Sequence, residues 1–397
     1  MREVWITGAG IISALGKGVR THSNAVSHSL TGLSSWNLFN GEPPDPCICG
    51  KVPAEAMDID IEESAPDRAN LLLVEAMNEA CTSASLPTPT DADCIVGTTL
   101  GNMHGGTCYY RRIQQNGVKD VSLVKHFLPC APITYVAKKL GITGKRWTVA
   151  SACGSAASAI GHAFRKIRRG KRECILAGGF EALSPFVVAG FNSLQLVSKK
   201  ESRPFDKNRE GLNPGEGAAI LVLESKESAL SRNVRPLGAI AGFGDALDAY
   251  HHTASHPEGL GLFNAISDAL KDAGLKPQHI DHIHLHGTGT KVNDDSEYNA
   301  LKKMFASSLP GIPVCSTKPM TGHTFGASGA INAIFTLITI NNGIIPATLF
   351  HQKRDPLFTD LLLFSKPQNV ENVSRVLSTS LGFGGEAFAL IIAKAED

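Results

Sequence analysis

Short apolar runs alternate with longer segments of helical periodicity along the whole chain of 397 residues. Between residues 68 and 85, for example, Leu72, Ala76 and Ala80 fall on one face of a predicted helix. Strands are predicted over residues 4–7, 94–99, 147–150, 174–178 and 218–223, and a second helix over 155–168. This alternation is typical of an α/β fold in which helices cover a sheet.

The second half of the chain repeats this order of elements. Strands are predicted over residues 235–244, 280–285, 314–317 and 386–393, and helices over 261–273 and 327–340. A strand, a turn and a helix of small residues occur at 147–168 and again at 314–340. We therefore interpret the chain as a duplicated α/β unit, with halves of residues 1–235 and 236–397 that pack together without a flexible linker.

The composition excludes several classes of protein. The net charge is +1, from 38 Lys and Arg against 37 Asp and Glu, which disfavours general binding to nucleic acid or to a membrane surface. The 39 glycines are spread along the chain, which indicates tight turns and close backbone contacts. The nine cysteines have neither zinc nor disulfide spacing, and no leader or long apolar run is present, so we expect a cytoplasmic protein.

A glycine pair follows the first predicted strand and partly matches a dinucleotide-binding fingerprint. Ser13 stands where the third glycine of that fingerprint belongs, after Gly8 and Gly10. No acidic residue lies between Glu3 and Glu42 to hold a ribose. We therefore favour a plain turn between a strand and a helix over a nucleotide site.

Cys153 is the strongest candidate for a nucleophile. A predicted strand delivers it to a tight turn at the start of a helix rich in small residues, beginning at Gly154 and Ser155. A helix N-terminus favours a thiolate and is expected to lower the thiol pKa, and its free N–H groups can hold an oxyanion. Six other cysteines are interpreted as small buried residues: Cys81, Cys94, Cys108, Cys130, Cys174 and Cys315. Cys47 and Cys49, in a proline-rich loop, are a weak metal or redox signal to which we assign no role.

Histidines and a lysine mark two further turns. His286 lies where an apolar strand runs into a Gly-Thr-Gly-Thr turn, at a strand end where open sheets place ligands. His282 and His284 alternate with it and permit a metal site, but we favour hydrogen-bonded strand residues because the nearby acids lack ligand-like spacing. In the second half, His323 occupies roughly the place of Cys153 in the first.

Lys318 and the glycines around Phe383 complete the set of candidates. A thiol near His286, Lys318 and His323 would suit covalent acyl transfer. Residues 382–385, Gly-Phe-Gly-Gly, are read either as a mobile gate or oxyanion donor, or as a tight hairpin with Phe383 in the core.

Taken together, these segments resemble the elongating β-ketoacyl-acyl carrier protein synthases of the thiolase superfamily, over essentially the whole chain. The order and spacing of the cysteine, the first histidine, the lysine and the second histidine carry the resemblance. The matching segments are 4–10, 152–154, 177–179, 202–206, 215–218, 248–251, 286–290, 318–323 and 382–385.

The resemblance implies a five-layered αβαβα fold of two similar halves and a decarboxylative Claisen condensation. Cys153 would take the acyl chain as a thioester. His286 and His323 would bind the malonyl thioester carbonyl and promote loss of CO₂, and the carbanion would then attack the acyl-Cys153 carbonyl. The N–H groups of Cys153 and Phe383 would form the oxyanion hole, and Phe383 would also gate the site.

The resemblance also assigns supporting residues to the substrate-binding region. Lys318 would orient the histidines with Glu216 as its partner, and Thr288 and Thr290 would contact the pantetheine arm. No metal and no cofactor of the protein's own is implied, because the phosphopantetheine arm belongs to the acyl carrier protein.

The implied partners are an acyl carrier protein and a second subunit. A homodimer is expected, with a heterodimer with a ketosynthase-like subunit as the alternative. Arg68, Arg165, Arg168 and Arg169 are candidate docking residues for an acidic carrier, although cations at residues 165–172 also suit a solvated helix end.

Several positions depart from the family pattern. Glu386 and Ala387 follow the Gly-Phe-Gly-Gly segment where Thr-Asn is common, Leu285 precedes His286 where a small residue is common, and residues 100–105 are unusual. These departures favour a specialised polyketide or polyene synthase over the housekeeping fatty-acid enzyme. The rival hypotheses are a non-catalytic chain-length-factor-like partner, a thiolase, an initiating synthase and a dehydrogenase.

Overall fold

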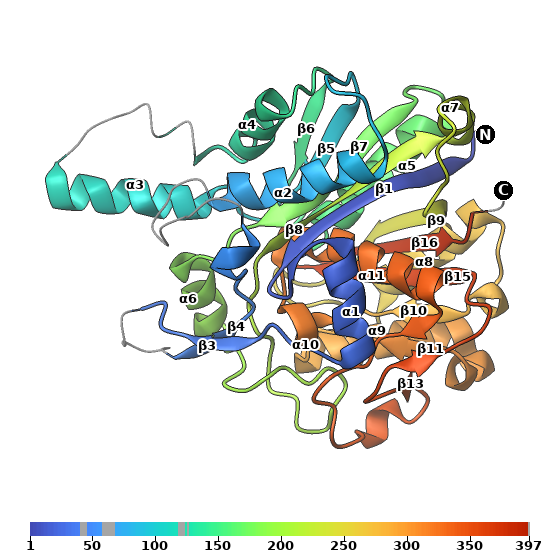
Figure 1. Cartoon of the computed structure of the whole chain (residues 1–397). Helices are drawn as coiled ribbons and strands as arrows, with labels where there is room; N and C mark the ends of the chain where they lie inside the picture. The colour runs from blue at the N-terminus through green and yellow to red at the C-terminus, as the bar shows by residue number, and fades with distance from the viewer. Residues whose placement is uncertain (40–45, 58–67, 118–123, 125–126, 396–397) are drawn as a thin grey trace.

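The computed structural model describes residues 1–39, 46–57, 68–117, 124 and 127–395. Within this part of the chain, hydrogen bonds connect twelve strands into one sheet that runs through the molecule (Figure 1). In order across the sheet, the strands are β13 (Leu362–Leu363), β11 (Pro313–Cys315), β10 (His282–His284), β15 (Arg375–Gly382), β16 (Glu386–Ala393), β9 (Gly238–Leu247), β1 (Val4–Ser13), β8 (Gly217–Ser225), β7 (Cys174–Glu181), β5 (Asp93–Gly97) and β6 (Arg146–Val149), with β2 (Gly16–Lys17) paired to β1.

The strand order repeats itself in the two halves of the chain. In the first half the order is β6-β5-β7-β8-β1, and in the second it is β11-β10-β15-β16-β9. The pairings match as well: the first two of each set are parallel, and the last two are antiparallel. The halves meet where residues 4–6 of β1 pair with residues 238–240 of β9. The repeated topology is that of a duplicated α/β unit.

Five layers result from the way helices cover the two half-sheets (Figure 1). The helices α5 (Ser155–Arg168) and α11 (Ser328–Asn342) pack against each other and share one apolar core with both half-sheets. On the outer faces, α2 (Arg68–Ser83) and α4 (Ala131–Lys139) cover the first half-sheet, and α8 (Leu260–Ala273) and α9 (Lys291–Phe305) cover the second. The expected αβαβα architecture is confirmed.

Shorter elements surround this framework, and α3 (Met103–Asn116) extends away from the main body (Figure 1). The others are α1 (Val19–His28), α6 (Pro185–Ser193), α7 (Lys226–Ser231), α10 (Lys318–Thr321) and the two-stranded pairs β3 (Ser34–Trp36) with β4 (Cys47–Cys49) and β12 (Ile344–Ile345) with β14 (Gln368–Asn369). No helix in the described ranges combines the length and apolarity that a bilayer span requires.

The glycines of the first strand serve packing, and the predicted turn at this point is wrong. β1 continues as a strand to Ser13, and a Cβ on Gly8 or Gly10 would lie 2.4 Å from the Ala80 carbonyl oxygen or 2.1 Å from that of Ala76. Both carbonyls belong to α2, so the two glycines let this helix rest directly on the strand.

Candidate active site

Cys153 lies at the junction between β6 and α5, in a strained turn. The preceding residue, Ala152, has a φ of 43°, in the left-handed region that non-glycine residues rarely adopt. Its carbonyl oxygen accepts hydrogen bonds from the hydroxyls of Thr99 (3.0 Å) and Ser155 (2.6 Å), which fix this conformation. Gly154 follows at the helix N-cap, where a Cβ would lie 2.1 Å from the ring of Phe388. The turn therefore holds the thiol at the head of the helix.

His286 lies in the loop between β10 and α9, which a buried carboxylate holds in place. Glu297, on α9, accepts hydrogen bonds from the backbone N–H groups of His286 and Gly287, each at 2.8 Å. The Thr379 hydroxyl donates to the same carboxylate at 2.6 Å and accepts from the His286 N–H at 2.9 Å. The backbone of His286 is thus anchored from both neighbouring elements.

Lys318 contacts both the ring and the backbone of His286. Its ammonium group donates to the His286 carbonyl oxygen, and its Nζ lies 3.4 Å from His286 Nδ1. Because the ammonium has only donors, Nδ1 must accept, which leaves the ring proton on Nε2. Burial lowers the pKa of Lys318 to about 8.

His323 approaches His286 edge-on. The two ring centroids are 5.3 Å apart with an interplanar angle of 85°. The His323 backbone is fixed by hydrogen bonds with Asn213 and Gly215, at 2.7 and 2.8 Å. Its Nδ1 is buried and has no hydrogen-bond partner among the described residues. The ring itself lines the cavity described below, where it can meet a ligand.

One cavity of about 210 Å³ brings these groups together. Its lining includes Cys153, His286, Thr288, Thr290, His323 and Phe383. Apolar side chains of Phe191, Leu194, Leu196 and Leu212 form another part of the wall. A polar, nucleophilic end next to an apolar wall suits a reactive thioester that carries a hydrocarbon chain.

Phe383 stands at this cavity with its ring stacked on Phe191, at a centroid distance of 5.5 Å and 21° between planes. The glycines after it, Gly384 and Gly385, have φ of 88° and 83°, so this hairpin needs glycine. Phe383 is half-buried. The aromatic ring thus occupies the cavity wall rather than the core, which favours the gate over the buried-hairpin interpretation.

Burial acts on the Cys153 thiol in the direction opposite to the expected lowering of its pKa. Burial raises the pKa of Cys153 to about 12, although the nearby Lys318 ammonium acts in the opposite direction. Burial also lowers the pKa of both His286 and His323 well below the usual value. The site therefore holds a thiol beside two neutral imidazoles, and these can accept or share a proton.

Two family models match the chain in succession: "Beta-ketoacyl synthase, N-terminal domain" over residues 1–229 and "Beta-ketoacyl synthase, C-terminal domain" over residues 237–351. The chain belongs to the β-ketoacyl synthase family. A "3-oxoacyl-[acyl-carrier-protein] synthase 2" of Staphylococcus aureus (strain COL) is 32% identical over 410 residues, which cover 100% of this chain and 99% of the relative.

Solved structures of β-ketoacyl synthases have the same fold. "The ishigamide ketosynthase/chain length factor" superposes with a TM-score of 0.91 at 30% identity, covering 100% of both chains. A type II polyketide ketosynthase, solved in complex with its acyl carrier protein, superposes with a TM-score of 0.91 at 26% identity and covers 99% of this chain and 100% of that one. These matches confirm the expected family and fold.

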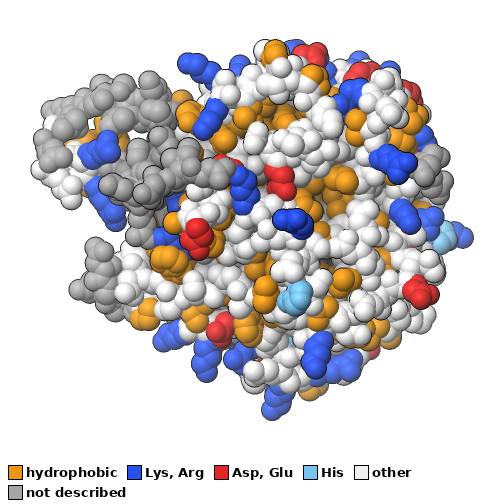
Figure 2. Space-filling view, in the orientation of Figure 1, with side chains coloured by type: hydrophobic (Ala, Val, Ile, Leu, Met, Phe, Trp, Pro, Cys, Tyr) orange, Lys and Arg blue, Asp and Glu red, His pale blue; other side chains and the backbone are white. Residues whose placement is uncertain are grey.

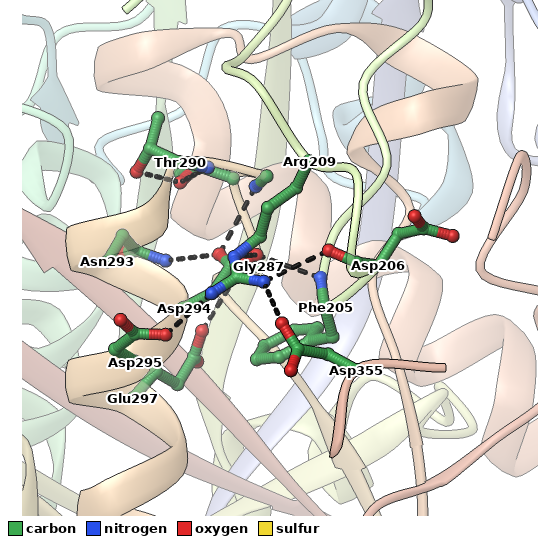
Figure 3. A network of polar contacts seen from close by, with 12 residues as sticks. Phe205, Asp206, Arg209, Gly287, Thr290, Asn293, Asp294, Asp295, Glu297 and Asp355 are labelled. Carbon is green, nitrogen blue, oxygen red and sulfur yellow. Dashed lines mark hydrogen bonds and ion pairs between the residues drawn. The ribbon is translucent and has the colours of Figure 1, made fainter. Parts of the chain in front are cut away.

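The sequence did not predict the polar network beside residues 287–290, the loop before α9 that we call the threonine loop (Figure 3). Asp294 accepts from the N–H groups of Phe205 (2.8 Å) and Gly289 (3.2 Å), while Arg209 donates to Asp295 and Asp355, each at 2.7 Å. Burial raises the pKa of Asp294 to about 7. The available signal was the spacing of Asp294 and Glu297 in the first turns of a helix, where carboxylates bind free N–H groups.

Thr288 and Thr290 flank Gly289, whose N–H binds Asp294 of this network. Their hydroxyls are 2.9 Å apart, and both side chains line the cavity. Gly287 and Gly289 have φ of 42° and 82°. The structure thus places both predicted pantetheine contacts at the cavity wall.

The structure contradicts the predicted role of Glu216. This side chain is fully buried, and its carboxylate accepts from Arg68 and from the N–H groups of Val52 (2.9 Å) and Leu183 (3.0 Å). It is neither the partner of Lys318 nor part of the cavity wall. Glu297 is the carboxylate that acts on Lys318.

The prediction that Arg68 docks a carrier protein is also wrong, because this side chain is buried. Its side chain is 6% exposed, and its guanidinium binds Glu216 through two nitrogens and the Val52 carbonyl oxygen at 3.1 Å. A buried guanidinium with these contacts cannot meet a carrier protein. Its role is to neutralise Glu216 between β8 and α2.

Replacing Arg68 by Met is expected to lower the free energy of unfolding by about 3–5 kcal/mol, because it leaves a buried carboxylate without its cation. Chemical denaturation measures the change. Arg165→Met is the matched control: the pair of Arg165 with Asp245 is 39% and 42% exposed and contributes at most about 1 kcal/mol. Equal losses in the two variants would contradict the assignment.

The remaining predicted docking residues lie at the far end of α5. Arg165 and Arg168 form ion pairs with Asp245 and Asp272, and Arg169 is exposed. A helix of 14 residues places them roughly 20 Å along its axis from Cys153. Lys and Arg side chains occur at several separate places on the face shown in Figure 2. Docking of a carrier at Arg165, Arg168 or Arg169 stays a prediction.

The departures from the family pattern have different surroundings. Leu285 is buried in the core of the second half, and Leu100 packs, like Phe191, against the small cluster that contains Cys153. Glu386 begins β16, and burial raises its pKa. The side chain of His104, in the unusual 100–105 segment, lies outside the described residues.

Proposed function

We propose that the protein is an elongating β-ketoacyl-acyl carrier protein synthase that uses Cys153 as its nucleophile. The observation that carries the proposal is the convergence of Cys153, His286 and His323 on one cavity of about 210 Å³, with Lys318 hydrogen-bonded to His286. An acyl thioester and a malonyl thioester would be joined there to a β-ketoacyl thioester and CO₂.

The first half-reaction transfers the acyl chain to Cys153. The thiol gives its proton to a neutral imidazole as the sulfur attacks the thioester carbonyl, and the proton then leaves with the pantetheine sulfur. The negative charge on the carbonyl oxygen falls beside the N–H groups of Cys153 and Phe383, neither of which donates to another described residue.

The second half-reaction begins with decarboxylation of the malonyl thioester. The electron pair of the breaking C–C bond moves into an enolate whose oxygen needs neutral donors. His286 can donate from Nε2 because Lys318 occupies Nδ1, and His323 approaches from the side. The carbanion attacks the acyl-Cys153 carbonyl, and the cysteine sulfur leaves and takes up a proton.

Pantetheine would enter along the threonine loop. Thr288 and Thr290 present two hydroxyls at the cavity wall and suit the amide groups of such an arm. The partner would be an acyl carrier protein, as in the type II ketosynthase complex named above, and the cofactor arm would come with it. A homodimer is proposed, with a chain-length-factor heterodimer as the alternative suggested by the ishigamide protein.

A non-catalytic chain-length-factor role is the second candidate, and the site argues against it. A subunit that does not catalyse the condensation does not need a strained cysteine turn, an oriented imidazole and a buried lysine at one cavity. The assay that tests the proposal combines malonyl carrier protein with a panel of saturated and unsaturated acyl carriers. Equal amounts of β-ketoacyl carrier and CO₂ are expected, and neither product would form if the chain were only a partner.

Replacing Phe383 by Ala is expected to speed hydrolysis of the acyl enzyme several-fold. The variant loses the stacking contact with Phe191, which opens the cavity to water. Intact-protein mass spectrometry measures how long the adduct on Cys153 lasts. Phe186→Ala, at a 60% exposed position of the same helix as Phe191, is the control and should leave the lifetime unchanged. An unchanged lifetime in Phe383→Ala would contradict a gating role.

A further inference from the structure

A cluster of two imidazoles and one thiol lies behind the active site. His282 and His284 alternate on β10, so their side chains share one face of the strand, and Cys315 pairs with His284 from the parallel strand β11. All three side chains are 0% exposed. The Cys315 sulfur lies 3.4 Å from His282 Nε2 and 3.8 Å from His284 Nδ1.

In each histidine, the ring nitrogen that points away from the Cys315 sulfur already has a hydrogen-bond partner. His282 Nδ1 lies 2.8 Å from the Pro313 carbonyl oxygen, which can only accept, so Nδ1 carries the proton and the lone pair of Nε2 faces the sulfur. His284 Nε2 lies 3.0 Å from the Thr317 hydroxyl, which leaves Nδ1 toward the sulfur. Metal-binding histidines are oriented by such partners on their second nitrogen.

The spacing of the three inner atoms suits three-coordinate binding. They all lie within 4.8 Å of one another, and no other group of three or more metal-ligating side chains occurs in the part of the chain that the structure describes. With metal–nitrogen and metal–sulfur bonds of about 2.0–2.3 Å, a trigonal centre separates its ligand atoms by roughly 3.5–4 Å. The sulfur–nitrogen separation of 3.8 Å falls in this range, and the separation of 3.4 Å lies just below it.

We propose that His282, His284 and Cys315 form a binding site for one monovalent copper ion. Two imidazoles and a thiolate in a trigonal set are typical of copper. On binding, Cys315 loses its thiol proton to solvent, His284 carries its proton on Nε2 toward Thr317, and the ion takes the vacated place between the three atoms. No electron is transferred in this step.

Charge favours copper over zinc at this position. A Cu⁺ ion with one thiolate and two neutral imidazoles is neutral, whereas Zn²⁺ with the same ligands would place a net positive charge in the interior. The cluster contains no carboxylate among the described residues, and the buried Lys318 ammonium acts on His284 as a neighbouring positive charge. A neutral complex avoids this repulsion.

The site would stiffen the framework that carries the catalytic groups. His284 is two residues from His286 and Cys315 is three residues from Lys318, so a bound ion would link the ends of β10 and β11 directly below both. Since all three ligands are buried, the ion would enter as the chain folds.

The test is to express the untagged protein with added copper, purify it without oxygen and count bound metal by mass spectrometry. X-ray absorption at the copper edge should show one sulfur and two nitrogens for one ion per chain. Cys315→Ser and His282→Gln should each lose this ion. Cys94→Ser, at a fully buried strand cysteine outside the cluster, is the matched control and should keep it.

Three outcomes would overturn the proposal. These are equal copper content in Cys315→Ser and the parent, a copper spectrum with sulfur ligands alone, or zinc in place of copper when both are supplied. Circular dichroism of each variant separates lost binding from lost folding, and two variants at different strands guard against a single misfolded one. Because condensation is not measured, the result is independent of the proposed synthase activity.

Discussion

Replacing Cys153 by Ala should abolish both acyl loading and condensation, with a loss of condensation on the order of 10³-fold or more. The cavity lining offers the acyl chain no other thiol, because Cys153 is the one cysteine among its described lining residues. Intact-protein mass spectrometry after incubation with an acyl donor should show a single adduct on the parent chain and none on the variant.

The same variant separates the two half-reactions. His286 and His323 remain in place in Cys153→Ala, so decarboxylation of malonyl carrier protein should continue while no β-ketoacyl product forms. Cys94→Ala, at a buried cysteine of β5 away from the cavity, is the control and should load normally. An acyl adduct that survives in Cys153→Ala would mean that another residue is the nucleophile.

The elements that carry the chemistry were predictable because their signals are local. The helix over residues 155–168 and the last strand over 386–393 were predicted with their observed bounds, and Cys153, His286 and His323 all follow strands that the apolar pattern marks. The internal repeat indicates that the turns before α5 and α11 are equivalent, which is enough to predict that Cys153 and His323 share one site.

What the sequence could not reveal depends on contacts between distant residues. Arg68 and Glu216 are 148 positions apart, and nothing in their neighbourhoods indicates that one neutralises the other. Arg68 looks like a docking residue in the sequence because a lone cation is usually exposed. In the fold, the Arg68 guanidinium offsets the cost of burying the Glu216 carboxylate, so the Arg68 side chain is buried rather than exposed.

Long-range packing also explains the mistaken turn after the first strand. The spacing of Gly8 and Gly10 resembles that of a phosphate-binding loop. In the fold, their lack of a Cβ instead allows α2 to pack directly against the strand. Cys315 shows the same limitation: it looks like an ordinary core cysteine until the parallel register of β10 and β11 places it between two histidines.

Replacing His323 by Ala should leave acyl loading of Cys153 largely intact but slow decarboxylation of malonyl carrier protein by about 10²–10³-fold, the usual effect of removing one donor to a developing oxyanion. His323 Nδ1 has no partner among the described residues, so its ring is not committed to holding the fold. Release of CO₂ in single turnover and the mass of the acyl enzyme measure the two steps separately.

His22 supplies a matched control for this variant. It is a buried histidine of α1 whose ring is held by Ser13 (2.7 Å) and the Gly18 carbonyl oxygen (2.8 Å), far along the chain from the cavity lining. Removing it should reduce stability and leave the ratio of the two rates unchanged. Equal loss of loading and decarboxylation in His323→Ala would contradict this assignment, because the imidazole would then serve both half-reactions. Selective loss of decarboxylation instead places His323 at the enolate oxygen, where its edge-on contact with His286 allows two N–H donors to meet one atom.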